Sequence, residues 1–444
     1  MNIPATTFGP PRVTTVCAIL CVALLAGSSF GAEAAAESAA PGLGRQAQKS
    51  LERRLIDAPD GVFGPRAWKR IARAVGDARV LYLGEPNHGS REIFLARNAL
   101  IREMHRRLGF DVILLEAGIG EVAAARMGVD ALDPSNGFVA ALNGAMFGGW
   151  RTEEMRNLFS FALEQNIDLA GYDVQKTGGG FRFWLDGFHE AYGGTESAGS
   201  ALEERFDRVQ RKLRDRQVAI EIFADDAQAL IREYDTLADY LAGMHRDHPR
   251  HRVEQRTDWH WKLIVRTLQN RAAFLRYMLD FRRDSDWNKR WAARDRMMAE
   301  NIAWLAEHFY SGGKIIVIGH NFHVARHNER EEVMGEYLEE LLDRPSYVLG
   351  AFSGRGEFAD NSGRPEPLSP PDPERLDIKH VILGMRAPLG FLDFPRQTRR
   401  RFGWLDRDIA VHDTFIDLSR GDSMKLRQHF DGLLLIKDSS LPRR

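Results

Sequence analysis

The chain has 444 residues, of which 44% are hydrophobic and 28% charged, and its formal net charge at pH 7 is -1. This is the composition of a globular protein with room for one large domain or two ordinary ones. The close balance of acidic and basic residues argues against a nucleic-acid partner and against binding to an anionic membrane surface.

The first 36 residues predict an export signal. Arg12 precedes the apolar run "VTTVCAILCVALLAG", and the small residues of "SSFGAEAAA" follow it. This order is typical of a secretory signal peptide, with cleavage expected after Ala34. The apolar run is shorter than the about 20 residues of a membrane span. We therefore expect no stable membrane insertion after signal cleavage and a periplasmic or secreted protein, with an uncleaved anchor as the alternative.

Cysteine usage narrows the chemistry. Both cysteines, Cys17 and Cys21, lie inside the predicted signal, so the mature protein is expected to contain none. That would exclude a disulfide framework, a cysteine nucleophile and thiolate metal sites. The predicted mature chain also lacks the Gly-x-Ser-x-Gly sequence that presents the serine nucleophile of α/β-hydrolases.

Six short apolar runs predict β-strands, namely "ARVLYLGE", "FDVILLEA", "IDLAGYD", "KIIVIGH", "SYVLGAFS" and "GLLLIKD". Helical patterns separate most of them. Residues 90–109 keep apolar side chains at near-helical spacing, and Gly109 stands where a helix-ending glycine is preferred. Alternating strands and helices favour right-handed crossovers and a parallel sheet. We predict an α/β fold with a central, mainly parallel sheet flanked by helices.

Residues 183–310 interrupt this alternation. They contain no good strand and two long amphipathic runs, at 214–244 and 259–283, which predict helices. We expect a large helical insertion that forms a wall or lid over a cleft. The predicted organisation is a signal peptide at 1–36, the first part of an α/β catalytic domain at 37–182, the insertion at 183–310 and the second part at 311–444. The segment "GRPEPLSPPDPER" predicts a proline-rich surface loop.

Ionisable residues stand at or just after the carboxyl ends of the first four predicted strands. They are Glu85, His88, Glu116, Asp173, His320 and His323. A single such residue is more often a cap or an ion-pair partner. The two histidines alone fit packing as well as chemistry. In a parallel sheet, however, these ends meet at one edge, where open α/β proteins bind ligands. Because unpaired charge is costly to bury, their convergence favours a functional cleft.

Such a cluster suits hydrolysis. Imidazole titrates near neutral pH, and a histidine oriented by carboxylates can take a proton from water. A second histidine near an arginine can stabilise an oxyanion or protonate a leaving alcohol. Because the predicted mature chain offers neither a cysteine nucleophile nor a Gly-x-Ser-x-Gly serine, direct attack by water is the simpler mechanism. The alternative is a divalent metal site, zinc or manganese, held by Glu85, His88, Glu116 and one of His320 and His323.

The motifs together resemble the erythromycin esterase family. The segment "LGEPNHGSREIF" resembles the family's Gly-Glu-x-x-His-Gly motif with its following Glu, and "VILLEA" its second-strand segment. Further blocks are similar to "WRTEEMRNLFSFALEQN", "GYD", "RWAARDRMMAENIAWL" and "GHNFHVAR". The match spans about Leu81 to Arg326, with a weaker similarity in "FDGLLLIKD". Pro86-Asn87 departs from the residue pair usual before the motif's histidine.

The resemblance implies a hydrolase with an α/β fold that opens a macrolide lactone and needs no resident metal. It makes His88 the general base that activates water, with Glu85 and Glu116 as catalytic or orienting carboxylates and His320 and His323 completing the site. For substrate binding we expect Glu92, Arg97, Trp150 and Asp173, although a surface role for Arg97 is equally compatible with the sequence. Phe147, Phe181 and Trp184 are further candidates to line the cleft, and core packing is their alternative.

Three functions remain open on the sequence. The first is an exported hydrolase of a small-molecule ester or macrolide lactone that uses His88 as base. The second is a metal-dependent hydrolase of a peptide or phosphoester that uses the same Glu/His cluster. The third is a non-catalytic envelope protein that holds a ligand at this cleft without turning it over.

Overall fold

The computed structural model describes residues 42–128, 137–191, 198–247, 255–284, 287–329, 331–395, 402–412 and 422–444. The predicted signal peptide at residues 1–36 lies outside the described residues. No helix in these ranges is both long enough and apolar enough to cross a bilayer.

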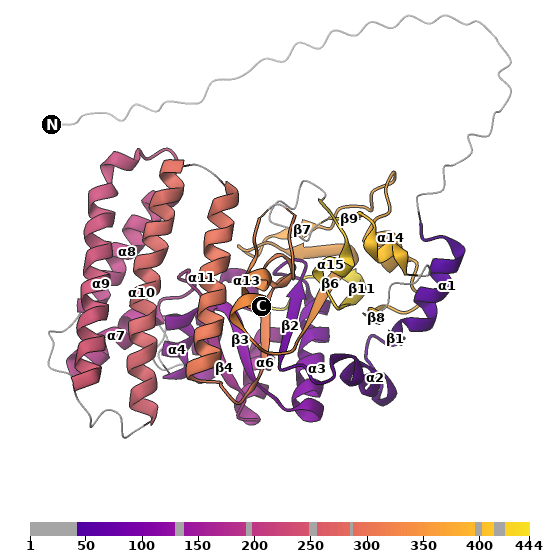
Figure 1. The fold of residues 1–444 in the computed structure, drawn as a ribbon, viewed down its shortest axis with the longest axis horizontal. Helices are drawn as coiled ribbons and strands as arrows, with labels where there is room; N and C mark the ends of the chain where they lie inside the picture. The colour runs from indigo at the N-terminus through magenta and orange to yellow at the C-terminus, as the bar shows by residue number, and fades with distance from the viewer. Residues whose placement is uncertain are drawn as a thin grey trace, which may run out of the picture. The chain divides into compact units, whose positions relative to one another are not determined.

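A nine-stranded sheet forms the centre, in the order β1-β8-β11-β6-β2-β5-β3-β4 with β7 paired to β6 (Figure 1). All six predicted strands are present, as β2 (Val80–Glu85), β3 (Phe110–Gly118), β4 (Asp168–Asp173), β5 (Lys314–His320), β6 (Ser346–Ala359) and β11 (Gly432–Ser439). These six pair in parallel. The α/β fold with a mainly parallel sheet is therefore confirmed.

The remaining strands were not predicted. Antiparallel β8 (Leu389–Asp393) and β1 (Ile56–Ala58) extend the sheet beyond β11. A short β7 (Pro365–Pro367) pairs with the end of β6, where the sequence predicted only a loop. Two prolines are tolerated there because an edge strand needs few ladder donors. A separate pair joins β9 (Ile409–Val411) and β10 (Asp422–Met424). The four other strands that were not predicted, β1, β7, β9 and β10, have three residues each, which is too few to show the alternation of apolar and polar residues that marks a strand.

The two faces of the sheet are buried by different helices. Leu81, Ile113 and Ile316 face one core with α2 (Pro65–Val75), α3 (Arg91–Leu108) and α6 (Glu153–Glu164). Their neighbours Tyr82 and Val317 face the opposite core with α11 (Trp287–His308), α13 (Met334–Leu341) and α14 (Ile378–Leu383). This strict alternation on strands that are apolar throughout is what a sheet covered on both faces requires.

The predicted helix before Gly109 is α3, and Gly109 ends it in the left-handed conformation, at φ 71°. The other described helices are short or lie at the edges. They are α1 (Arg45–Arg54), α4 (Ile119–Arg126), α5 (Phe138–Ala145), α12 (Asn321–Val324) and α15 (Leu426–His429), with 3-10 turns at Gly148–Trp150, Ile220–Ile222 and Gly403–Asp406.

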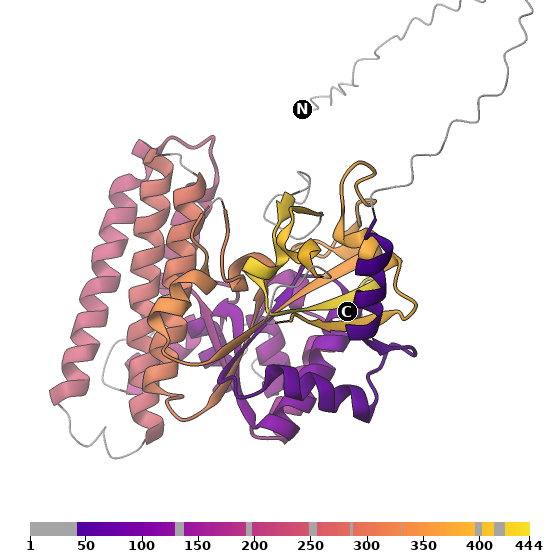
Figure 2. The same ribbon diagram turned by 45° about the vertical axis from the view of Figure 1, so that its right-hand side comes forward.

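Between β4 and β5 the described chain is helical, through α7 (Gly180–Ala191), α8 (Ala198–Arg214), α9 (Ala224–Asp247), α10 (Gln255–Asp284) and α11. Figures 1 and 2 show α8, α9 and α10 side by side, beyond the β4 edge of the sheet. These helices share a third core, which includes Phe181 and Trp184. The predicted helix at 214–244 begins later than expected, at Ala224. There Asp225 and Asp226 favour a helix start through the helix dipole. The proposed domain boundaries stay a prediction.

Candidate active site

A cavity of about 510 Å³ opens at the carboxyl ends of the central strands. Five of the nine predicted site residues line it, namely His88, Glu116, Asp173, His320 and His323. Asn87, Phe147, Gln175, Thr177, Arg294, Phe322 and the segment Phe358–Asn361 complete its walls. The register explains the meeting, because β2 pairs Glu85 with His320 of β5, and β3 lies on the other side of β5.

Glu85 and His88 form a hydrogen-bonded pair at the end of β2. The Glu85 carboxylate is fully buried and lies 2.6 Å from Nδ1 of His88. Two further donors hold that carboxylate, Nη1 of Arg97 at 2.5 Å and Nε1 of Trp150 at 2.7 Å. Since a carboxylate accepts, Nδ1 of His88 donates, and Nε2 is left as the basic nitrogen. The ring is thus oriented and presents a base at the cavity wall.

Glycines let the chain turn tightly around this pair. A Cβ on Gly84 would lie 2.2 Å from Oδ1 of Asn321, and one on Gly89 would lie 2.1 Å from the carbonyl oxygen of Ala359. Asn321 in turn bonds the backbone of Ala351 through both ends of its amide. The motif glycines are therefore required by close approach of neighbouring segments.

We expect Gly89→Ala to lower the free energy of unfolding by about 1–3 kcal/mol, because the added methyl group meets rigid backbone. Gly187→Ala is the matched control, since its Cβ would meet nothing within 4 Å and alanine favours the interior of α7. Urea unfolding of both variants measures the difference. Equal stabilities would show that the turn relaxes freely.

His320 lines the cavity, but both of its ring nitrogens form hydrogen bonds with backbone groups. Its Nε2 lies 2.8 Å from the carbonyl oxygen of Pro86, which can only accept, and its Nδ1 accepts from the N–H of Phe322 at 3.2 Å. Only the neutral ring with the proton on Nε2 satisfies both bonds. Burial, reinforced by the neighbouring His88 and His323, lowers the pKa of His320 to about 3. In this structure His320 therefore clamps β5 to the His88 turn, and its predicted catalytic part stays a prediction.

This lowered pKa makes stability depend on pH. Below the ordinary value of 6.5 the unfolded chain binds a proton that the folded chain does not. The contribution of His320 to the free energy of unfolding should therefore be fully present above pH 6.5. Below that pH it should fall by about 1.4 kcal/mol per pH unit. Between pH 6.5 and 5 we expect a loss of about 2 kcal/mol beyond that of the non-titrating variant His320→Gln. Denaturant unfolding at the two pH values tests it, and identical losses would contradict the assignment.

Arg294 of α11 links the acidic side of the cavity. Its guanidinium donates to Asp173 at 2.6 and 3.2 Å and to Glu116 at 3.1 Å. Burial would raise the pKa of Glu116, but His323, His88, Arg294 and the backbone N–H of His320 lower it to about 2. Glu116 is therefore an acceptor at neutral pH. Sequence reasoning did not single out Arg294.

His323 forms a second carboxylate–histidine pair. Its Nδ1 lies 2.8 Å from the fully buried Asp295, and its Nε2 lies 3.4 Å from Glu116 and 3.0 Å from Nη1 of Arg294. Burial would lower the pKa of His323, but Asp295 and Glu116 outweigh it and raise the pKa. Arg294 and Asp295 both lie in the segment "RWAARDRMMAENIAWL", so the motif held the signal that spacing along the strands did not.

Four predicted site residues lie outside the cavity wall. Glu85, Arg97 and Trp150 are buried behind His88, where they orient it. Glu92 accepts hydrogen bonds from the backbone N–H and the hydroxyl of Ser440, at 2.7 and 2.6 Å, and so anchors the end of the chain. Glu92, Arg97 and Trp150 thus do not line the cavity, and their part in substrate binding stays a prediction.

The same contacts test the metal alternative. Arg97 occupies the Glu85 carboxylate, and Arg294 occupies Glu116 and Nε2 of His323. At each of these potential metal-ligand atoms a positively charged guanidinium already stands where a metal cation would bind. Within the described ranges no three His, Cys, Asp or Glu side chains are grouped so that they could hold a metal ion. The residues present do not fit a zinc or manganese site.

Known proteins resemble this chain in sequence. The family model described as erythromycin esterase matches residues 105–439. YbfO of Bacillus subtilis strain 168, whose name assigns it provisionally to the hydrolases, is 23% identical over 96% of this chain and 97% of its own. Erythromycin esterase type II of Escherichia coli is 22% identical over 84% of this chain and 93% of its own.

Among solved structures, a histidine-to-asparagine mutant of the erythromycin esterase EreC in its open conformation superposes with a TM-score of 0.61. The two chains are 14% identical, and the match covers 87% of this chain and 98% of EreC. At that identity the likeness shows the fold alone. The family match spans most of the chain and includes Glu116, Arg294 and both cavity histidines of β5 and α12. The protein therefore belongs to the erythromycin esterase family.

Proposed function

We propose that this protein is a carboxylic-ester hydrolase in which His88 is the general base. The observation that carries the proposal is the Glu85–His88 pair. A fully buried carboxylate, held by Arg97 and Trp150, fixes the imidazole by its Nδ1 at the wall of a cavity. An oriented histidine of this kind is the usual device for taking a proton from water.

In the proposed reaction, water lies between Nε2 of His88 and the ionised Glu116. His88 takes one proton as the water oxygen attacks the acyl carbon. The tetrahedral intermediate then collapses, the bond to the alcohol oxygen breaks, and His88 gives the proton that it took from water to the leaving alkoxide. His323 and Arg294 position Glu116 in this reaction, since Nε2 of His323 accepts from Nη1 of Arg294 and its Nδ1 donates to Asp295.

We propose a hydrophobic ester or macrolide lactone as substrate. Phe147, Phe322 and Phe358 supply apolar surface to a cavity whose other walls are mostly polar or charged. The name of the Escherichia coli relative and the family description support a lactone of the erythromycin type. The signal pattern at residues 1–36 supports export, so the enzyme would meet its substrate in the periplasm or outside the cell.

The test is mass-spectrometric hydrolysis of a macrolide panel and of simple aryl esters by the purified protein, with and without a chelator. Gain of one water by a macrolide, unchanged by the chelator and lost in His88→Ala, is the expected result. Loss of activity with the chelator and recovery with zinc or manganese would assign a metallohydrolase instead. Ligand retention without turnover of any ester would favour the non-catalytic alternative.

A further inference from the structure

The proposed base lies between two segments of the chain. The turn that carries His88 leads into α3, and a second segment, which ends just before α6, packs against the imidazole. Phe147 and Trp150 of this second segment contact the ring edge-on, with ring centroids 4.7 and 6.1 Å away. A Cβ on Gly149 would lie 3.2 Å from Cβ of His88. The position of the imidazole therefore depends on how the two segments are held together.

Residues 439–443, here called the strap, begin at the last residue of β11 and complete the start of α3. The backbone N–H of Arg91, the first residue of α3, donates to the carbonyl of Ser440 at 2.9 Å. In return, the N–H and the hydroxyl of Ser440 donate to the carboxylate of Glu92, at 2.7 and 2.6 Å. The side chain of Ser90 makes no cap of its own. Since the first N–H groups of a helix have no partner within it, the strap supplies one.

The strap repeats this arrangement at the start of α6. The N–H of Glu153, the first residue of α6, donates to the carbonyl of Arg443 at 2.7 Å, and the N–H of Arg443 donates to Glu154 at 3.1 Å. The carboxylate of Glu154 is 3% exposed and also accepts from Nε of Arg91 at 3.0 Å. Pro442, between the two points of contact, is buried. One short segment thus joins the first turns of two helices.

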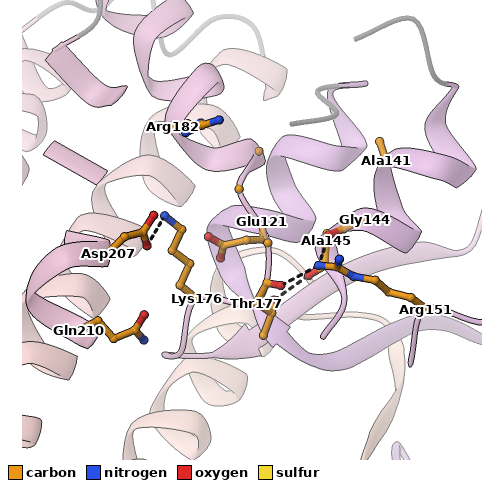
Figure 3. A pocket seen from close by; sticks show the side chains of 13 residues that line it. Glu121, Ala141, Gly144, Ala145, Arg151, Lys176, Thr177, Arg182, Asp207 and Gln210 are labelled. Carbon is orange, nitrogen blue, oxygen red and sulfur yellow. Dashed lines mark hydrogen bonds and ion pairs between the residues drawn. The ribbon is translucent and has the colours of Figure 1, made fainter. Parts of the chain in front are cut away.

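The segment with Trp150 is fixed from its other side by Arg151. Nε of Arg151 donates to the carbonyl of Met146 at 2.7 Å, and its Nη2 donates to the carbonyls of Gly144 and Thr177, at 3.1 and 3.4 Å. In Figure 3 the guanidinium points toward Gly144 and Thr177, at the edge of a second cavity of about 390 Å³. These bonds tie the segment to the loop at Thr177 but not to the start of α3, which the strap reaches.

We propose that the strap positions the general base, with Glu92 and Glu154 as the positioning residues. At α3 it holds the helix that follows the His88 turn. At α6 it holds the segment of Trp150, whose indole N–H donates to Glu85 at 2.7 Å. Neither positioning glutamate lines the active-site cavity, so each acts through the base. A displacement of about 1 Å can cost about 10²-fold in rate. This inference rests on the proposed ester hydrolysis.

Steady-state kinetics on an ester that the wild type hydrolyses tests the positioning role. We expect Glu92→Ala and Glu154→Ala each to lower kcat by about tenfold to hundredfold, with KM within about twofold of the wild-type value. Glu92→Gln should recover most of the loss, because the amide oxygen still accepts from the N–H of Ser440. Glu164→Ala is the matched control and should keep the wild-type kcat, since Glu164 is an exposed glutamate at the far end of α6.

Amide hydrogen exchange read by mass spectrometry tests the strap without any need for turnover. Glu92 binds Ser440, so its loss should reach the segment at residues 147–152 through the strap. We expect Glu92→Ala to raise exchange in that segment about tenfold while β3 and β5 stay protected. A general loss of stability would instead raise exchange in these central strands as well, which separates the two effects.

Wild-type exchange at residues 147–152 in Glu92→Ala, or a matching rise in β3 and β5, would overturn the inference. So would an unchanged kcat in both alanine variants, a rise in KM alone, or an equal loss in Glu164→Ala. The proposed function fails separately. A local rise in exchange as expected, with no ester hydrolysed by the wild type, would contradict the hydrolase but not the clamping of the two segments by the strap.

Discussion

His88→Ala is expected to lower kcat for ester hydrolysis by about 10²–10⁴-fold, because the general base is lost. The side chain lines the cavity and is partly exposed, so its removal should leave the unfolding midpoint close to that of the wild type. Glu85→Gln should lower kcat in the same direction with His88 still present, since the amide no longer fixes the Nδ1 proton. Steady-state kinetics on one ester that the wild type hydrolyses measures both effects.

His308→Ala is the control for this series. His308 is a half-exposed histidine on α11 whose Nδ1 lies 3.1 Å from the carbonyl of Trp304, outside the cavity wall. Its variant should retain full activity. Wild-type kcat in His88→Ala would remove His88 from the mechanism, whatever the behaviour of Glu85→Gln.

Arg294→Ala is expected to lower the free energy of unfolding by about 3–5 kcal/mol, because it strands two buried carboxylates. Glu116 and Asp173 are 4% and 3% exposed, and both depend on the same guanidinium. Arg294→Lys should recover part of the loss, since one ammonium reaches fewer of these acceptors than a planar fork does. Urea unfolding measures the two variants.

Arg296→Ala provides the control two positions away. Arg296 is exposed on α11 and pairs only with Glu300 among the described residues, at 3.2 Å, and surface pairs of this kind contribute about 0–1 kcal/mol. A loss in Arg294→Ala no larger than that in Arg296→Ala would show that the acidic wall is stable without its arginine.

The parts of the fold that could be predicted have a strong local signal. Each of the six predicted strands is a run of apolar residues buried on both faces, so the run itself marks the strand. Polar residues at the ends of β2, β3, β4 and β5 then had to meet at one edge. The antiparallel β8 and the three-residue strands lacked this signal, because their pairing is set by tertiary contact.

Roles within the site were harder to predict, because they depend on orientation. His320 and His323 are three residues apart, yet one is clamped neutral by two backbone groups and the other is paired with Asp295. Arg97 is buried beneath His88, whereas Glu92, five residues earlier on the same helix, binds the end of the chain. Arg294 lies on α11, 178 and 121 residues along the chain from Glu116 and Asp173, the carboxylates of β3 and β4 that it binds. The fold places its side chain at the cavity, and the spacing of apolar residues along the sequence does not predict this placement.

A single-turnover reaction in H₂¹⁸O, with enzyme in excess over an ester that it hydrolyses, tests the direct attack of water most directly. Mass spectra of the acid product and of the digested enzyme are recorded together. If His88 activates water, the first turnover places one ¹⁸O in the acid, and the enzyme carries neither an acyl group nor the label. An acylated peptide, or ¹⁸O in the carboxylates of Glu116 or Asp173, would contradict the account and assign a covalent intermediate.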